Sequence, residues 1–253
     1  MLSVEVNGGV MVATLSRPPV NALNEVLIEH LEDVLDEVVA NKSVCVLHIR
    51  SDQKAFSAGA DLALMQSCFA TPEGLEVMIA IVRRMQALFA RIESAPVVTL
   101  AEIGGAAVGG GLELALACDL RVAAAEAKLG LTEARLGLLP GAGGTQRLTR
   151  LCGRGLANRL ILGGDVITGA EALELGIVQW ACPRSQLIDR ARELAAHYAS
   201  TPRATAALIK KCLGVADDRG LDGYENEITG TRQLYGNQET RRRVADFLNK
   251  TAA

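Results

Sequence analysis

Residues 104–119 read GGAAVGGGLELALACD, a glycine-rich turn that runs into an alanine- and leucine-rich segment. The apolar run at 96–101, PVVTLA, precedes this stretch and predicts a buried strand. The leucine-rich segment predicts a helix that begins after the glycines at 109–111. Glycines have no Cβ, so a ligand can lie directly on the backbone, and the first N–H groups of a helix have no internal partner. The stretch therefore predicts a strand–turn–helix unit with exposed amide donors.

Glu113 lies in the first turn of this predicted helix, close to the exposed amides. Two interpretations are open. The glutamate either complements the helix dipole, as many first-turn acids do, or acts as a functional carboxylate beside an anion- or oxyanion-binding turn. The glycine spacing matches neither a dinucleotide fingerprint nor a phosphate loop. A second segment favours the functional interpretation.

That second segment, residues 129–148, reads LGLTEARLGLLPGAGGTQRL and places Glu133 in an apolar loop bounded by glycines. Apolar neighbours are expected to raise the pKa of Glu133 toward neutral pH. Residues 119–124 predict a strand, so a helix, a returning strand and a turn can bring Glu133 near Glu113. Two carboxylates that face one small volume can hold a water molecule and move its proton.

These two segments resemble the crotonase superfamily, and within it the enoyl-CoA hydratases; the resemblance runs from about Val10 to Phe247. It implies an α/β fold, a crotonase-like right-handed spiral of repeated ββα units with two layers of sheet and an α-helical C-terminal trimerisation region. The sequence itself repeats strand, strand and helix in its first half and becomes all-helical after residue 184. We therefore expect residues 1–184 to form the spiral core with the acyl-CoA site. Residues 185–253 are expected to form a helical oligomerisation region.

The resemblance also implies roles for individual residues. Glu113 and Glu133 correspond to the catalytic acids. The backbone N–H groups of Ala60 and Gly110 correspond to the oxyanion hole, which would grip the thioester carbonyl as negative charge builds on it. Ala60 lies in the segment 54–62, KAFSAGADL, which by itself also fits a plain loop with an aspartate cap.

The resemblance also implies residues that contact coenzyme A. By the same resemblance, Ala58 and Leu62 lie along the adenine side of the ligand, and Tyr235 and Lys250 fall near the CoA nucleotide. Tyr235 and Lys250 also fit structural or surface roles. The family often has a basic residue for the CoA phosphates where this chain has Pro19-Val20, so either Arg17 or a neighbouring subunit is a candidate to replace it.

The activity that the resemblance implies is that of a lyase, an enoyl-CoA hydratase. It adds water across the 2,3 double bond of a trans-2-enoyl-CoA and yields a 3-hydroxyacyl-CoA. We expect no cofactor and no metal, because coenzyme A enters as part of the substrate. The expected partners are an acyl-CoA thioester and further copies of the chain, in a homotrimer or a hexamer of two trimers. Alternatives are an enoyl-CoA double-bond isomerase, which needs one base, and a non-catalytic acyl-CoA- or RNA-binding homologue.

The amino-acid composition argues against nucleic-acid-binding and membrane-spanning proteins and indicates a redox compartment. The 253 residues are 49% hydrophobic and 22% charged, and a net charge of −3 offers no electrostatic attraction to nucleic acid or an anionic membrane. No apolar run approaches the about 18 residues of a membrane span, and the N-terminus does not read as a signal peptide. The six cysteines form no Cys-x-x-Cys pair, so they indicate a reducing compartment, and we expect the cytoplasm.

Other reactive side chains fit structural roles. The three histidines lie far apart, show no metal-ligand spacing, and leave His48 in a predicted strand as a structural residue. No serine lies in a nucleophile elbow, which argues against a serine hydrolase. Glu102, at the end of a buried strand, departs from the family's usual approach to the oxyanion turn, so it is either paired or faces an edge.

Three local predictions complete the picture. Asn21 is expected to cap a helix that runs to about Val39. Thr168 is expected to open a short helix with a capping box. A helix over 73–93 is expected to bury one apolar stripe, made of Leu75, Met78, Ile79, Val82, Met85, Leu88 and Phe89.

Overall fold

The computed structural model describes residues 1–68, 71–216 and 220–251, in which the strands form two sheets. The six-stranded sheet has the order β1 (Leu2–Asn7), β2 (Val10–Leu15), β3 (Val46–Ser51), β5 (Val98–Ile103), β7 (Leu120–Ala124) and β10 (Trp180–Cys182). The four-stranded sheet has the order β4 (Ala55–Ser57), β6 (Ala106–Val108), β8 (Lys128–Gly130) and β9 (Ile167–Thr168).

The helices fill the intervals between these strands. They are α1 (Glu25–Ala40), α2 (Leu62–Cys68), α3 (Pro72–Glu93), α4 (Gly110–Ala117), the 3-10 turn η1 (Glu133–Leu136), α5 (Gly144–Gly163), α6 (Gly169–Glu174), α7 (Arg184–Ala199), α8 (Arg203–Gly214), α9 (Gly223–Gly236) and α10 (Gln238–Thr251). Helix α5 is kinked at Gly153, whose φ of 77° and ψ of 159° are not helical. Thr168 and Glu171 form the expected capping box at the start of α6.

A ββα unit repeats along the chain. Strands β3, β5 and β7 enter the large sheet, and each is followed by a strand of the small sheet, β4, β6 or β8. All of these neighbours pair in parallel. Each unit then leaves through helices, α2 and α3 after the first, α4 after the second, and η1 and α5 after the third. This repetition agrees with the strand–strand–helix pattern of the sequence and with the spiral that the family resemblance implies.

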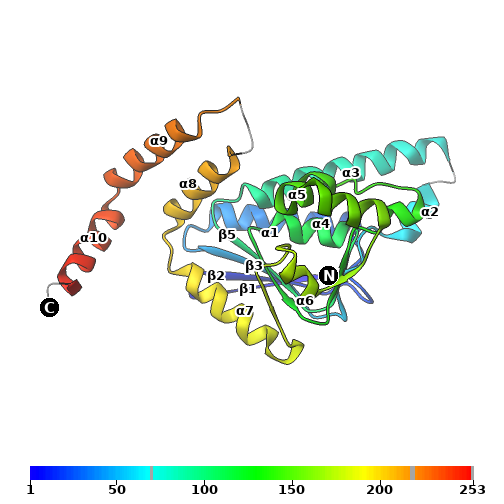
Figure 1. The fold of residues 1–253 in the computed structure, drawn as a ribbon, viewed down its shortest axis with the longest axis horizontal. Helices are drawn as coiled ribbons and strands as arrows, with labels where there is room; N and C mark the ends of the chain where they lie inside the picture. The colour runs from blue at the N-terminus through cyan, green and yellow to red at the C-terminus, as the bar shows by residue number, and fades with distance from the viewer. Residues whose placement is uncertain (69–70, 217–219, 252–253) are drawn as a thin grey trace.

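Helices cover both faces of the large sheet (Figure 1), with α7 on the opposite side from α1, α4 and α5. Helix α4 lies at the centre, because every residue from Gly110 to Ala117 is buried. A helix that is apolar on all sides belongs in a core, and its start is therefore a fixed platform. No helix in the described ranges is long and apolar enough to cross a membrane.

The prediction that Asn21 caps the first helix is wrong. The cap is Asn24, whose Oδ1 accepts a hydrogen bond from the Leu27 N–H at 3.0 Å. Asn21 is fully buried with a φ of 50°, and its amide donates to Ser51 Oγ at 2.7 Å and to the Phe56 carbonyl at 3.0 Å. These partners lie far along the chain, so tertiary contacts decide which asparagine caps the helix.

The predicted apolar stripe of the long helix is wrong at its N-terminal end. Leu75 is 60% exposed and Ile79 is 40% exposed. The first turns of α3 extend past the body of the molecule toward α2 (Figure 1), so they have no sheet to cover. Further along, Met85, Leu88 and Phe89 are buried as expected, and Ile81 and Ile92, which the prediction did not include, are buried with them.

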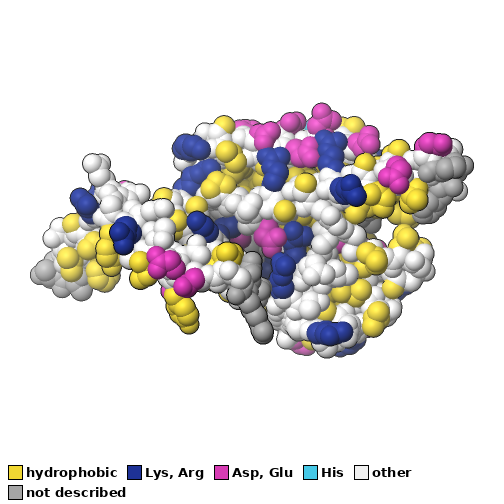
Figure 2. Space-filling model, turned by 90° about the horizontal axis from the view of Figure 1, so that it is seen from above, with side chains coloured by type: hydrophobic (Ala, Val, Ile, Leu, Met, Phe, Trp, Pro, Cys, Tyr) yellow, Lys and Arg dark blue, Asp and Glu magenta, His cyan; other side chains and the backbone are white. Residues whose placement is uncertain are grey.

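The C-terminal helices separate into two groups. Helix α7 packs on the sheet, and Leu187, Ala191 and Leu194 belong to the core. Helices α9 and α10 extend away from the body (Figure 1), and Figure 2 shows hydrophobic side chains in several clusters on this arm, beside charged ones. The exposed apolar residues of the arm include Tyr224, Ile228, Tyr235, Val244, Phe247 and Leu248. The division at residue 184 and the oligomerisation role stay predictions.

Candidate active site

Two backbone segments pack tightly where helix α4 begins. A Cβ atom at Gly59 would lie 2.7 Å from the Val108 carbonyl oxygen and 2.9 Å from the Gly110 nitrogen. Gly59 also has a φ of 83°, which side chains disfavour, so this approach requires glycine. A Cβ atom at Gly110 would in turn lie 3.7 Å from the Ala60 nitrogen. The structure therefore brings together the two amides that, by the family resemblance, correspond to an oxyanion hole.

The Ala60 amide faces away from the adjacent segment of the same chain, which contains Leu23. Ala60 pairs with Leu23 in a parallel bridge, in which the Leu23 N–H donates to the Gly59 carbonyl and the Asp61 N–H donates to the Leu23 carbonyl. Backbone groups alternate in direction along an extended segment, so the intervening Ala60 N–H points the other way. Gly110 is the first residue of α4, where N–H groups have no intrahelical partner. Neither amide has a backbone acceptor among the residues described here.

Glu113 lies one turn into α4 and is only 2% exposed. Its Oε1 atom accepts hydrogen bonds from the Ala142 and Gly144 N–H groups, both at 2.8 Å. Gly143, between these donors, has a φ of 104°, and such a turn aims successive amides at one anion. Burial, together with the smaller effect of the Glu133 charge, raises the pKa of Glu113 to about 7, although the two amides and Arg147 oppose the rise.

Glu133 opens the turn η1 and lies against the start of α4. A Cβ atom at Gly109 would be 3.2 Å from its Oε1, which places this carboxyl beside the helix N-terminus. Its Oε2 atom is buried and has no hydrogen-bond partner within the described part of the chain. Burial also raises the pKa of Glu133. Both acids therefore flank one helix terminus, in surroundings that disfavour their ionised forms.

The expected CoA contacts fall into two groups. Ala58 and Leu62 flank the Ala60 segment, Ala58 half-buried and Leu62 62% exposed at the start of α2. Tyr235 is 72% exposed on α9, in the arm that leaves the body, so a single chain does not bring it to the two glutamates. The side chain of Lys250 lies outside the described residues. Their contacts with CoA stay predictions.

Arg17 is engaged within the protein. Its guanidinium donates to Asp61 Oδ2 at 2.6 Å and to the Ala22 carbonyl at 2.9 Å. Asp61 in turn accepts from the amides of Ala63 and Leu64 at the start of α2. Arg17 thus braces the loop that presents Ala60, and its charge is compensated by Asp61.

Glu102 is paired inside the sheet. His48 Nε2 and Glu102 Oε2 lie 3.0 Å apart on the adjacent strands β3 and β5, although their alignment lacks hydrogen-bond geometry. Arg50 Nε also lies 3.4 Å from Glu102 Oε1. Burial raises the pKa of Glu102, but His48 and Arg50 outweigh it and hold the pKa below its ordinary value. No cluster of three or more potential metal-ligating side chains occurs in the described ranges.

Sequence reasoning missed the turn that binds Glu113. Ala142 and Gly144 lie in a run, GAGG, that reads as an ordinary glycine-rich connection before α5. The available signal is the combination of Pro140, three glycines and a helix start, since such a turn often exposes amides. Nothing in the local sequence shows that these amides point at Glu113, which lies 29 positions before Ala142 and 31 before Gly144.

Several known proteins similar to this chain are described as enoyl-CoA hydratases. The family model for enoyl-CoA hydratase/isomerase matches residues 5–252. A probable enoyl-CoA hydratase of Bacillus subtilis is 42% identical over 211 residues, covering 83% of this chain and 80% of that protein. A short-chain-enoyl-CoA hydratase of Clostridium acetobutylicum is 32% identical over 252 residues, covering 98% and 94%. The crystal structure of an enoyl-CoA hydratase from Bacillus anthracis superposes with a TM-score of 0.90 at 32% identity, covering 98% and 96%, and confirms the predicted fold.

Proposed function

Because the chain belongs to the enoyl-CoA hydratase/isomerase family of the crotonase superfamily, we propose that it is an enoyl-CoA hydratase. It would add water across the 2,3 double bond of a trans-2-enoyl-CoA to give a 3-hydroxyacyl-CoA. One observation carries this proposal: Glu113 and Glu133 flank the same helix terminus at which the Ala60 and Gly110 amides meet. Two carboxyls and an oxyanion site are what hydration of a conjugated thioester requires.

The amides of Ala60 and Gly110 would bind the thioester oxygen. When water attacks C3, electrons move from the double bond onto that oxygen and form an enolate. Two preorganised donors stabilise this charge without reorganising, and loss of one such donor typically costs about 3 kcal/mol of transition-state stabilisation. The proposal is supported by the lack of a backbone acceptor for either amide in the described part of the chain.

Glu133 would be the main acid and base. Its Oε2 atom, buried without a partner among the described residues, would accept a proton from water as the water oxygen bonds to C3. The same carboxyl would then give a proton to C2, so that the thioester carbonyl reforms and Glu133 is ionised again. Glu113 would orient and polarise the water through its Oε2, because its Oε1 is already held by two amides.

Coenzyme A would enter as part of the substrate, with no other cofactor and no metal. Ala58 and Leu62 would lie along the adenine, and Tyr235 and Lys250 are proposed to approach the nucleotide. For Tyr235 this would require a neighbouring copy of the chain, since α9 leads away from its own body. All six cysteines are free thiols, which supports a reducing compartment, and we propose the cytoplasm.

The oligomer would be a homotrimer or a hexamer of two trimers, formed through the region 185–253. Exposed apolar side chains on α9 and α10, such as Phe247 at 69% and Leu248 at 61%, support a covering partner. Sedimentation equilibrium of the wild-type protein is expected to give three or six copies, and Phe247→Glu to weaken the assembly. A monomeric wild-type protein at micromolar concentration would refute this part of the proposal.

The activity is tested with a panel of 2-enoyl-CoA thioesters of short, long, branched and aromatic acyl groups. Hydration removes the absorbance of the conjugated thioester, and Glu113→Gln and Glu133→Gln are both expected to abolish its decay. A Glu133→Gln variant with the full rate would contradict the proposed role of that residue. The isomerase alternative predicts instead that a 3-enoyl-CoA gains the absorbance, and a non-catalytic binder would change neither substrate.

A further inference from the structure

The turn that binds Glu113 is itself held from behind by two side chains. We propose that Gln86 and Arg147 are positioning residues, which orient the 141–144 turn so that its amides fix the Glu113 carboxylate. This inference rests on the proposed function for its catalytic consequence, but its structural part is independent of any activity.

Gln86 fixes the first donor peptide. Its Nε2 atom donates to the Gly141 carbonyl at 2.6 Å. The Gly141 carbonyl and the Ala142 N–H belong to the same planar peptide group and point in opposite directions. Holding the carbonyl toward α3 therefore aims the N–H at Glu113 Oε1. A carbonyl that accepts a hydrogen bond also polarises the N–H of its own peptide.

Arg147 fixes the next peptide. Its Nη1 atom donates to the Ala142 carbonyl at 3.0 Å, and a Cβ atom at Gly143 would lie only 2.2 Å from Nη1. The guanidinium thus packs directly on the left-handed residue of the turn. The third peptide is held by the start of α5, where the Gly143 carbonyl accepts from the Arg147 N–H at 2.9 Å. Each peptide of the turn has one fixed orientation.

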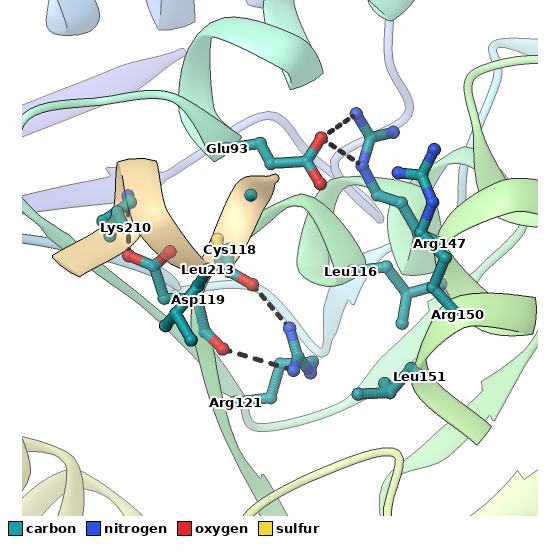
Figure 3. Close-up of a pocket in the computed structure, with 11 residues that line it drawn as sticks. Glu93, Leu116, Cys118, Asp119, Arg121, Arg147, Arg150, Leu151, Lys210 and Leu213 are labelled. Carbon is teal, nitrogen blue, oxygen red and sulfur yellow. Dashed lines mark hydrogen bonds and ion pairs between the residues drawn. The ribbon is translucent and has the colours of Figure 1, made fainter. Parts of the chain in front are cut away.

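Arg147 is in turn anchored by Glu93 at the end of α3. Its Nε and Nη2 atoms donate to Glu93 Oε2 at 3.2 and 2.9 Å. Figure 3 shows this pair at the wall of a cavity of about 600 Å³ between α4, α5 and α8. The arginine side chain is 11% exposed. It acts on Glu113 through the turn and through its positive charge, and so is a positioning residue.

This arrangement explains why an ionisable group survives in the core. Without its two amides, a carboxylate that is 2% exposed would be deeply unfavourable when charged. The positive charge of Arg147 and the amides both lower the pKa of Glu113, against burial and the charge of Glu133. Removing Arg147 therefore removes a cation and loosens the donors, and both effects raise the pKa of Glu113.

The first test titrates Glu113 itself. Protein labelled with ¹³C at glutamate carboxyls is titrated by NMR without substrate, and Glu113→Gln assigns the signal. Arg147→Gln is expected to raise the Glu113 midpoint by up to about one pH unit. Arg147→Lys keeps the positive charge but loses the several N–H donors of the guanidinium, so it should shift the Glu113 midpoint less than Arg147→Gln. Gln86→Met should shift the midpoint slightly. Arg159 lies on the same helix as Arg147 and forms an exposed ion pair with Asp165, which follows the helix. Arg159→Gln should leave the Glu113 midpoint unchanged.

The second test is kinetic. Arg147→Gln and Gln86→Met are expected to lower kcat about tenfold while KM for the enoyl-CoA stays within about twofold, because misplacement of a catalytic group affects the chemical step. Arg159→Gln should match the wild type in both constants. If Arg147→Gln does not fold, Arg147→Lys and Gln86→Met carry both tests.

Each outcome bears on the proposal. An Arg147→Gln variant whose Glu113 midpoint equals that of Arg159→Gln, with kcat also unchanged, overturns it. A shifted midpoint in a protein with no hydratase activity on any thioester keeps the positioning role and refutes the proposed function. A normal midpoint with low kcat would mean that Arg147 acts on the reaction by another route, and it also overturns the proposal.

Discussion

The Gly144 nitrogen and the Glu113 Oε1 atom lie 2.8 Å apart, so a backbone amide at the start of α5 binds a carboxylate in the core helix α4. The approach is close enough to exclude any side chain at position 144. A Cβ atom there would lie 2.9 Å from Pro140 Cβ and 3.0 Å from Glu113 Cγ. Two helices are thus joined through the acid proposed to orient the attacking water.

Gly144→Ala should therefore damage both stability and activity. The added methyl group must displace Pro140 or Glu113, and overpacking of this kind costs about 1–3 kcal/mol. We expect the free energy of unfolding to fall by that amount and kcat to fall at least about tenfold. Gly155→Ala, on the same helix, is the matched control. An added Cβ atom there would meet no heavy atom within 4 Å beyond the adjacent backbone of its own helix. It should be neutral or slightly stabilising. Equal effects of the two substitutions in urea unfolding and kinetics would contradict the crowding at position 144.

Glu113→Gln should stabilise the protein above neutral pH. The folded-state pKa of Glu113 is raised to about 7 from 4.5. Between these values the folded protein keeps a proton that the unfolded chain loses, so stability falls as pH rises through the window. Glutamine does not titrate, and its oxygen can accept both amides. Urea unfolding is therefore expected to show a gain over wild type of about 1–3 kcal/mol at pH 8 and little gain at pH 5.

A control for this pH dependence is Glu171→Gln. Hydrogen bonds from Thr168 lower the pKa of Glu171, so it is ionised at both pH values. Its substitution should change stability equally at pH 5 and pH 8. If Glu113→Gln behaved in the same way, the buried glutamate would not titrate in that window.

Asn21→Ala should destabilise the loop that presents Ala60. The Asn21 amide donates to Ser51 and Phe56, and its oxygen accepts from the Arg17 N–H at 2.7 Å. Leaving these buried groups unsatisfied costs about 1–3 kcal/mol. Asn21→Gly separates the two contributions, because glycine relieves the positive φ of 50° but still loses the amide. We expect Asn21→Gly to be less destabilising than Asn21→Ala in thermal unfolding. The reverse order would show that the left-handed backbone is not the source of the difference.

The buried His48–Glu102 pair is expected to show strong coupling. His48→Leu removes the partner of the Glu102 carboxylate, which is only 4% exposed. Breaking a buried pair in this way lowers the free energy of unfolding by about 3–5 kcal/mol. The double variant with Glu102→Leu removes both polar groups and should be more stable than His48→Leu alone. A double-mutant cycle by urea unfolding measures this difference. Additive effects would show that the 3.0 Å contact contributes nothing.

Local sequence determined most of the secondary structure. Glycines placed the start of α4 and the kink at Gly153, and Thr168 with Glu171 opened α6, because backbone dihedrals and capping depend on a few adjacent residues. The order of strands and helices then placed Glu133 near the start of α4. The sequence thus predicted the repeat and the neighbourhood of the two glutamates.

Tertiary structure decided what each group contacts. Asn21 and Asn24 are the same residue type three positions apart, yet packing makes one a buried brace and the other a helix cap. Leu75 and Ile79 fit the apolar period of α3, but the sheet does not reach them. Glu113 receives its amides from residues 29 and 31 positions away. Such contacts depend on how helices and strands pack. Hydrophobic burial drives this packing but is not directional, so a local sequence pattern does not reveal which residues meet.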